Sequence, residues 1–467
     1  MNQEYTPVML ENRTYDELQV GDSASLTRTL TKDDIDAFAI LSGDVNPAHL
    51  DDAYAKDTPF QKVIAHGMWG GTLISTVLGT QLPGPGTIYV GQNMRFMRPV
   101  SLGDTITVTL TVKEKKPKNM VVLECSCTNQ LGKPVIVGEA EIMAPTAKVR
   151  RPQAPLPRMH LHRLERYEQL MSLVKDKPAV RCAVVFPEDA ATLKAALHAS
   201  QQGLIMPVLI GSRERISALG QQLELDLIDC LWREAECAVQ AASIAVEMAR
   251  DGEVAAIMQG SIPIHVLMKR VLRHAGGLRT SRRVSHAYVA DVPSYPQPLI
   301  ITDAEVNVRP NVDESRDIVQ NAIDLAHRLK LNEPRVAVVS AAEDFNSNLE
   351  SSTTAAVLCK MHERGHITGA LLDGPMTFDA AVHPEVARAK YPNSPVAGQA
   401  NILMVPNLEA ANMLVKQLAH FAHADIAGIV LGAKVPVILT NPIDTPRTRL
   451  ASAALGRLMI RSCNKKS

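Results

Sequence analysis

The chain has 467 residues, of which 46% are apolar and 21% charged, the composition of a globular protein with a large buried core. At about 150 residues per domain, this length predicts two to four domains. The 49 basic and 49 acidic residues leave no net charge, and aromatic residues make up only 4%. These values argue against nucleic acid as a partner, because such proteins combine positive charge with base-stacking aromatic rings.

No apolar run reaches the ~18–20 residues that a membrane span requires. The N-terminal segment carries acidic residues throughout and lacks the basic-then-apolar order of a signal peptide. The seven cysteines are odd in number and contain no Cys-x-x-Cys pair, so they do not indicate a disulfide framework. We therefore expect a cytoplasmic protein with no membrane partner.

The N-terminal part begins with signals for one helix and then another. Thr31 and Asp34 form a capping-box pattern, and the apolar stripe that follows ends at Gly43. A second helical stretch follows His66-Gly67 and is apolar almost all round, which predicts a buried helix. Later segments alternate with a period of two and predict strands: 106–112, 120–128 and 135–142. An antiparallel sheet around one buried helix, an α+β architecture, fits this order.

Four prolines in the stretch 144–157 mark the clearest break in the chain, because proline at this density favours an extended connector. We therefore predict an N-terminal domain over residues 1–144, a linker over 145–158 and a C-terminal domain over 159–467.

The C-terminal part alternates short apolar runs with amphipathic helical stretches. The helical stretches include 313–331 and 408–420, and the apolar runs are 183–186, 208–210, 255–258, 336–339, 402–405 and 437–439. Buried strands alternating with helices predict a mostly parallel α/β sheet with helices on both faces. About 310 residues suffice for two subdomains around a cleft.

The stretch Asp44-Val45-Asn46-Pro47-Ala48-His49 carries the main chemical signal of the N-terminal part. Asn-Pro favours a turn, which can direct Asp44 and His49 toward one point. A carboxylate beside an imidazole can hold a water and divide general-base and general-acid work. Gly67 begins the second helix, and its backbone N–H, at the positive end of the helix dipole, can stabilise a thioester oxygen.

These residues resemble the MaoC-like, R-specific enoyl-CoA hydratases of the hot-dog fold. The similarity covers roughly residues 16–142 and also includes Gln81-Leu82-Pro83-Gly84 and Phe96-x-x-Pro99-Val100. It implies catalytic roles for Asp44 and His49, an oxyanion donor at Gly67, and further substrate-site roles for Ser75 and Asn46. Thioesterases of this fold commonly have a carboxylate on the central helix. Residues 67–102 contain no Asp or Glu, so a thioesterase is disfavoured.

The C-terminal part resembles the phosphate acetyl/butyryltransferases over roughly residues 167–459. The stretches that carry the resemblance are Asp373-Gly374-Pro375, Asn393-Ser394-Pro395-Val396-Ala397-Gly398, Gly432-Ala433-Lys434-Val435-Pro436 and Gly277-Leu278-Arg279-Thr280. It implies a two-subdomain α/β fold, similar to that of isocitrate and isopropylmalate dehydrogenases, and acyl transfer between CoA sulfur and phosphate. Arg270, Arg279, Arg282 and Arg283 are candidates for phosphate contact, and Asp444 for the base.

The chain departs from this family pattern at three places. The family's Ser-Arg-x-Asp reads Asn441-Pro442-Ile443-Asp444, its Lys-Gly reads Gln259-Gly260, and its Gly-Asn reads Ala411-Asn412. Proline and glutamine supply no cation, and charge-assisted contacts with phosphate are worth roughly 1.5–3 kcal/mol each. We therefore predict that CoA binds but that acyl-phosphate formation is weak or absent.

No metal or nucleotide cofactor is expected. The stretch His362-Glu363-Arg364-Gly365-His366 matches a zinc pattern that needs both histidines on one helical face, but Gly365 is typical of a helix end. The substrates implied are acyl-CoA or enoyl-CoA, with phosphate as a second substrate of the C-terminal domain. A homo-oligomer is expected, because an exposed sheet edge favours pairing.

The sequence thus predicts a fusion of an enoyl-CoA hydratase with a phosphate acyltransferase-type domain. Two other interpretations stay open. In one, only the hydratase is active and the C-terminal domain is a CoA-binding or dimerising module, which Pro442 favours. In the other, the whole chain is a non-catalytic acyl-CoA sensor, against which the intact pair Asp44 and His49 argues.

Overall fold

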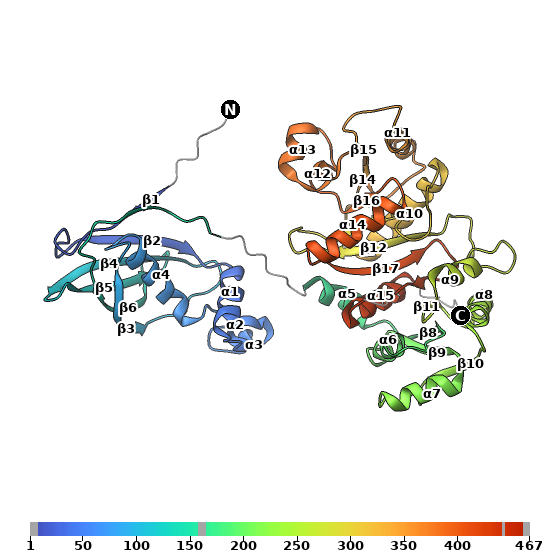
Figure 1. Cartoon of the computed structure of the whole chain (residues 1–467), viewed down its shortest axis with the longest axis horizontal. Helices are drawn as coiled ribbons and strands as arrows, with labels where there is room; N and C mark the ends of the chain where they lie inside the picture. The colour runs from blue at the N-terminus through green and yellow to red at the C-terminus, as the bar shows by residue number, and fades with distance from the viewer. Residues whose placement is uncertain (1–7, 157–164, 441–443, 461–467) are drawn as a thin grey trace. The chain divides into compact units, whose positions relative to one another are not determined.

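The computed structural model describes residues 8–156, 165–440 and 444–460 (Figure 1). The chain divides into two compact units, Met1–Leu161 and His162–Ser467. Each unit encloses hydrophobic side chains of its own, in one cluster in the N-terminal unit and in four in the C-terminal unit, counted over the described residues.

The N-terminal unit is a five-stranded antiparallel sheet packed against one central helix, α4, as Figure 1 shows. The strand order is β2-β4-β5-β6-β3. The elements are β1 (Met9–Glu11), β2 (Ser23–Thr29), α1 (Lys32–Ser42), α2 (Pro47–Leu50), α3 (Asp52–Lys56), α4 (Gly67–Thr80), β3 (Ile88–Phe96), β4 (Thr105–Lys116), β5 (Met120–Thr128), β6 (Pro134–Met143) and β7 (Arg150–Pro152). The predicted α+β architecture is present.

Local sequence signals set the ends of α1. The Thr31 side chain accepts the Asp34 backbone N–H and the Asp34 side chain accepts the Thr31 N–H, so the predicted capping box is formed. The helix ends at Gly43, whose φ of 75° lies in the left-handed region that glycine tolerates best. The residue after this end is Asp44, so the helix end fixes where the candidate site begins.

Helix α4 is buried on one side only, which corrects the prediction of a fully buried helix. Its residues Trp69, Leu73, Ile74, Val77 and Leu78 enter the core. The opposite side, which includes Ser75, is exposed in the single chain. Apolar residues on all sides of a helix favour burial of the whole helix surface. They do not show that a single chain buries both sides.

The first half of the predicted linker belongs to the N-terminal unit. Strand β7 pairs antiparallel with β1. The buried Asn12 side chain fixes this segment, because it donates to the Ala147 carbonyl (2.9 Å) and accepts the Val149 N–H (2.9 Å). Residues 157 and 158 of the predicted linker lie outside the described residues.

The C-terminal unit contains one eleven-stranded sheet with helices around it (Figure 1). The strand order is β10-β9-β8-β11-β18-β17-β12-β13-β16-β14-β15. The strands are β8 (Val180–Val185), β9 (Ile205–Gly211), β10 (Leu231–Glu234), β11 (Ala256–Gln259), β12 (Ser285–Asp291), β13 (Leu299–Thr302), β14 (Arg335–Val339), β15 (Leu371–Met376), β16 (Ile402–Met404), β17 (Asp425–Leu431) and β18 (Val437–Ile438). The helices are α5 (Glu165–Lys175), α6 (Ala190–Gln201), α7 (Arg213–Gln222), α8 (Ala238–Arg250), α9 (Ile264–Val271), α10 (Val312–Arg328), α11 (Glu350–Glu363), α12 (Phe378–Val382), α13 (Pro384–Lys390), α14 (Leu408–Phe421) and α15 (Pro446–Met459).

The sheet is parallel on both sides of an antiparallel centre. Strands β18, β17, β12 and β13 pair antiparallel, and the strands that flank this group pair parallel. All six predicted apolar strands are present, and the predicted helices correspond to α10 and α14. The antiparallel strands β12 and β17 were not predicted, although they hold the two parallel parts together.

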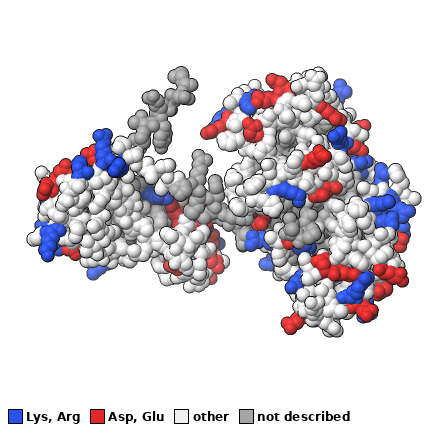
Figure 2. Space-filling view, viewed as in Figure 1, with Lys and Arg blue, Asp and Glu red and all other residues white. Residues whose placement is uncertain are grey.

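The charged side chains show no dominant sign. Basic and acidic residues are interspersed over the visible face of both units in Figure 2. Among the helices of the described residues, none is long and apolar enough to span a membrane.

Candidate active sites

The predicted turn between α1 and α2 fixes the Asp44 carboxylate. Its Oδ1 accepts the Asn46 N–H at 3.2 Å, and the Asn46 side chain in turn accepts the Ala48 N–H at 3.0 Å as the N-cap of α2. Pro47 occupies the first turn of α2, where its missing N–H costs nothing. The turn leaves Asp44 exposed and places half-buried His49 on α2.

One hydrogen bond determines which nitrogen of His49 can act as a base. The Nδ1 atom lies 2.9 Å from the Ile64 carbonyl oxygen. A carbonyl only accepts, so Nδ1 carries the proton of the neutral ring. The Nε2 atom therefore keeps a lone pair that can accept a proton.

His66 is a component of the site that the sequence analysis did not assign a role. Its Nε2–H donates to the Asp44 carbonyl oxygen at 3.0 Å, and the residue is only 3% exposed. Its ring lies against His49 on one side and Phe38 on the other, with centroid distances of 4.0 and 4.9 Å. The sequence feature that could have identified His66 is its position directly before Gly67, at the start of α4.

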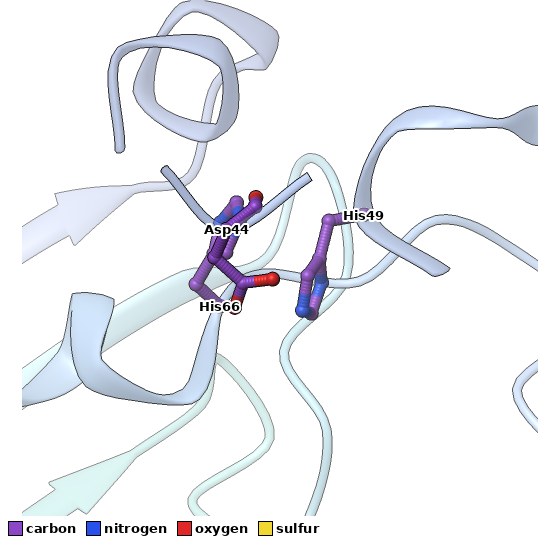
Figure 3. Close-up of side chains that lie close together, drawn as sticks. All are labelled: Asp44, His49 and His66. Carbon is purple, nitrogen blue, oxygen red and sulfur yellow. The ribbon is translucent and has the colours of Figure 1, made fainter. Parts of the chain in front are cut away.

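Asp44, His49 and His66 form one cluster of polar atoms. Figure 3 shows the Asp44 carboxylate directed toward the His49 ring, with His66 beside them. One ligand-type atom from each residue lies within 4.8 Å of the other two. Two imidazoles and a carboxylate are donors that zinc accepts. However, His66 already uses Nε2 on the Asp44 carbonyl, and its Nδ1 is buried from solvent without a partner in the described residues.

A cavity of about 330 Å³ adjoins this cluster. His49 and His66 form part of its wall, together with Gly67 at the start of α4 and the Phe96–Val100 stretch. The N-cap residue of α4 gives its first N–H groups no side-chain acceptor. A Cβ atom at Gly67 would lie 3.3 Å from the Phe96 ring, so glycine keeps this N–H accessible beside the aromatic wall.

Two predicted substrate-site residues do not line this cavity. The Asn46 side chain is engaged in capping α2, and exposed Ser75 lies two turns along α4 from Gly67. The structure thus groups Asp44 with His49 and His66, and it places His49, His66 and Gly67 around the cavity, whose wall does not include Asp44.

The C-terminal unit has its own candidate cavity, of about 570 Å³. Gln259 and Gly260 form part of the wall, as do Glu305 and buried Arg449. The Arg449 guanidinium donates to the Asp444 carbonyl at 3.3 Å, which places the predicted base next to this wall. Asn441, Pro442 and Ile443, on which the predicted loss of phosphate contacts rests, lie outside the described residues.

The predicted arginines do not gather at this cavity. Arg279 contacts His274, Arg282 pairs with Asp324, and Arg283 pairs with Glu314. Arg270 lies on α9, and its Nε is buried without a partner in the described residues. The described wall of this cavity includes Arg449 and none of these four arginines.

The carboxyl groups of this cavity add negative charge. Burial raises the pKa of Glu305, while a hydrogen bond from the Tyr288 hydroxyl (2.9 Å) and the Lys416 ammonium lower it, and the Asp444 charge raises it. Asp189 accepts hydrogen bonds from Ser261 and from the N-terminus of α6, which outweigh burial and lower its pKa. An anionic substrate would therefore meet carboxylates as well as Arg449.

The comparisons with known proteins match the N-terminal and C-terminal parts of the chain to two different families. Residues 19–128 match the family model "MaoC like domain", and residues 232–456 match the family model "Phosphate acetyl/butaryl transferase". A phosphate acetyltransferase of Rhizobium meliloti is 45% identical over 293 residues, which are 63% of this chain and 93% of that protein. The chain belongs to the phosphate acetyl/butyryltransferase family and carries a MaoC-like domain in front of it.

Further known proteins are similar to one part of the chain or the other. A phosphate butyryltransferase of Clostridium beijerinckii is 33% identical over 63% of this chain and 97% of that protein. A branched-chain phosphotransacylase of Enterococcus faecalis V583 is 25% identical, covers 60% of this chain and 100% of its own, and has a TM-score of 0.53. An R-hydratase, PhaJ1 of Pseudomonas aeruginosa, is 50% identical over 33% of this chain and 100% of its own, with a TM-score of 0.33.

Proposed function

We propose that the N-terminal unit adds water across the double bond of a (2E)-enoyl-CoA to give a (3R)-3-hydroxyacyl-CoA. The observation that carries this proposal is the orientation of His49. Its Nδ1–H is bound to the Ile64 carbonyl, so Nε2 keeps a lone pair, and the ring belongs to one cluster with Asp44. The MaoC-like family match supports the same conclusion.

In this mechanism one water lies between Asp44 and His49. His49 Nε2 takes a proton from the water as the water oxygen bonds to C3, while the Asp44 carboxylate holds the water in place. The protonated Nε2 then delivers that proton to C2, so the addition is balanced. The Gly67 N–H binds the thioester oxygen, where negative charge develops as the enolate forms. The acyl chain lies along the Phe96–Val100 wall of the cavity.

No metal or organic cofactor is required for this reaction. We expect hydratase turnover to be unchanged after dialysis against EDTA, because the imidazole supplies both proton transfers and the carboxylate holds the water. Added zinc should inhibit, since it would bind Asp44 and the unprotonated Nε2 of His49 and so block the proton transfers. An EDTA-inactivated enzyme that zinc restores would contradict this expectation.

The direct test is hydration of crotonyl-CoA by the purified full-length chain. The loss of the conjugated thioester is followed by absorbance, and the stereochemistry of the product is checked with an R-specific dehydrogenase. Turnover to the 3R product supports the proposal. Binding of crotonyl-CoA without turnover would favour the acyl-CoA sensor.

For the C-terminal unit we propose acyl transfer between CoA and phosphate with low turnover. Relatives named phosphate acetyltransferase support the reaction class. Pro442 and Gln259, in place of a family arginine and lysine, support the low rate, as do the carboxylates of the cavity. Losing two charged contacts should lower the rate ~10²–10⁴-fold below that of a fully charged site. The alternative is a CoA-binding or dimerising module without catalysis.

Incubation with phosphate and acetyl-, propionyl- or butyryl-CoA distinguishes these two alternatives. Turnover of tens per second would contradict the low rate and favour Asp444 as the base. If transfer is slow, Gln259→Lys restores an ammonium at the cavity wall and should raise the rate, with Gln221→Lys on the surface of α7 as the matched control.

We propose a cytoplasmic homodimer or higher oligomer that joins through the open edge of β3. An unpaired strand edge with exposed apolar side chains supports this assembly. The antiparallel centre between two parallel parts supports the expected likeness of the C-terminal unit to isocitrate dehydrogenase-like folds.

A further inference from the structure

A separate cavity of about 240 Å³ lies in the C-terminal unit where β14 and β16 end. These strands run parallel, so their carboxyl ends meet at one edge of the sheet, the edge at which α/β proteins place ligands. The segments that follow them, the starts of α11 and α14, form part of the wall. None of the residues lining this cavity lines the cavity at Gln259.

Helix α11 presents an uncapped N-terminus to this cavity. Asn407 caps the neighbouring α14 by accepting the Ala410 N–H at 2.9 Å. The N-cap residue of α11 is Leu349, which has no side-chain acceptor. The first N–H groups of this 14-residue helix therefore lack a side-chain cap, although the Ser352 N–H bonds to the Leu349 carbonyl at 3.0 Å. The helix dipole adds partial positive charge there.

A buried hydroxyl in the wall also lacks a partner. Ser315 is 1% exposed, and its Oγ makes no hydrogen bond within the described part of the chain. Leaving a buried polar group unpaired costs free energy, so such a group commonly marks a ligand or ordered-water position. Ser351 and Thr354 of α11 also line the cavity, and the Ser351 hydroxyl is already hydrogen-bonded to the Ser340 hydroxyl at 2.9 Å.

The charged residues of the wall are Arg309 and Glu350, both exposed. Arg309 makes no ion pair with a described residue. A guanidinium, several hydroxyls and an uncapped helix start are the groups that bind phosphate oxygens. The Glu350 carboxylate would repel an anion, whereas the donor groups of the wall would attract it. Replacing Glu350 should therefore change the affinity in the opposite direction.

We propose that this cavity binds a phosphate group, with Arg309, Ser315 and the start of α11 as its donors. The cavity is too small for a whole CoA molecule but takes inorganic phosphate or the terminal phosphate of a larger ligand. Binding here does not depend on the transferase reaction, because the cavity at Gln259 has different walls.

The test is calorimetric titration of the full-length chain with inorganic phosphate at fixed ionic strength. Arg309→Gln should weaken binding about tenfold and Ser315→Ala about fivefold, as expected for a charged and a neutral hydrogen bond. Glu350→Gln should strengthen binding about two- to fivefold by removing a like charge. A gain in affinity cannot result from misfolding.

Arg328→Gln is the matched control, since Arg328 is exposed at the far end of α10. Its phosphate affinity should equal that of the wild type. The proposal is overturned if Arg309→Gln and Arg328→Gln bind phosphate equally, or if Glu350→Gln weakens binding.

Parallel titrations with CoA and 3′-dephospho-CoA identify the source of the phosphate. If the cavity takes the CoA 3′-phosphate, 3′-dephospho-CoA binds more weakly than CoA, and Arg309→Gln leaves the affinity for 3′-dephospho-CoA unchanged. If it takes free phosphate, the two CoA compounds bind equally and are insensitive to Arg309. A chain without transferase activity but with Arg309-dependent phosphate binding would reject the transferase proposal and retain this one.

Discussion

Asp44 and His49 act on one water in the proposed hydration, so their contributions should not add. Asp44→Asn and His49→Ala should each lower crotonyl-CoA turnover ~10²–10⁴-fold, and the double variant should be little slower than either. Asparagine keeps the Oδ1 acceptor for the Asn46 N–H, so the turn should persist. Melting temperatures provide the folding control, and near-normal turnover of Asp44→Asn would refute the assignment.

His66 contacts both members of this pair without donating to substrate. His66→Phe keeps a ring against His49 but removes the donor to the Asp44 carbonyl. We expect kcat to fall about fivefold to tenfold with little change in KM, because one neutral hydrogen bond that positions Asp44 is lost. His66→Ala should cost more, since the ring contact also disappears. Equal kcat values for His66→Phe and the wild type would make His66 a packing residue only.

His286 in the C-terminal unit gives a pH-dependent prediction. Complete burial lowers its pKa from 6.5 to about 3, so the folded protein binds fewer protons than the unfolded chain between these values. The stability that this histidine confers is therefore present above pH 6.5 and is lost as pH falls toward 3. His286→Leu removes this dependence.

The free energy of unfolding of His286→Leu, relative to the wild type, should fall by about 1.4 kcal/mol for each unit rise in pH between 4 and 6. Buried Asp303, whose pKa burial raises to about 6, contributes the opposite slope to both proteins and cancels in the difference. Urea unfolding in a Trp69→Phe background, followed by Trp232 fluorescence, measures the C-terminal unit. A pH-independent difference would contradict the prediction.

At the scale of elements, β3 is one of the two edge strands of the N-terminal sheet, and β2 is the other. Ile88, Val90 and Phe96 are each more than half exposed along β3. Val90→Lys places a charge at this edge, which should convert the expected dimer into a monomer. Sedimentation velocity measures the change. Leu131→Lys, at an exposed turn between β5 and β6, is the control and should leave the assembly intact. Identical sedimentation of both variants would exclude the β3 edge as the interface.

At the scale of the whole molecule, the two units have separate cores, and we expect residues 1–156 to retain the hydratase kcat within about twofold. A fragment that ends at residue 144 removes the Ala147 and Val149 partners of buried Asn12, which should cost roughly 1–3 kcal/mol of stability. Thermal unfolding of the two fragments measures this difference. Equal melting temperatures would mean that β7 does not stabilise the unit.

The sequence by itself determined features that rest on neighbouring residues. Thr31 and Asp34 cap α1, Gly43 ends it, and Gly365 follows the end of α11 so that His366 leaves the helix, because caps and turns are local interactions. The Asp44–His49 motif also lies within one turn, so its clustering followed from six residues. The buried parallel strands were predictable because each is a continuous apolar run.

Only the tertiary structure decided contacts between distant segments. His66 meets Asp44 across 22 residues. Two of the four predicted arginines, Arg282 and Arg283, pair with Asp324 and Glu314 of α10 instead of lining the cavity at Gln259. Ser75 proved exposed because the apolar α4 is covered on one side only. Strands β12 and β17 pair with each other across more than 130 residues, and no local period marks such a partner. Pairing, burial and charge neutralisation depend on what the rest of the chain places nearby, which a linear pattern does not contain.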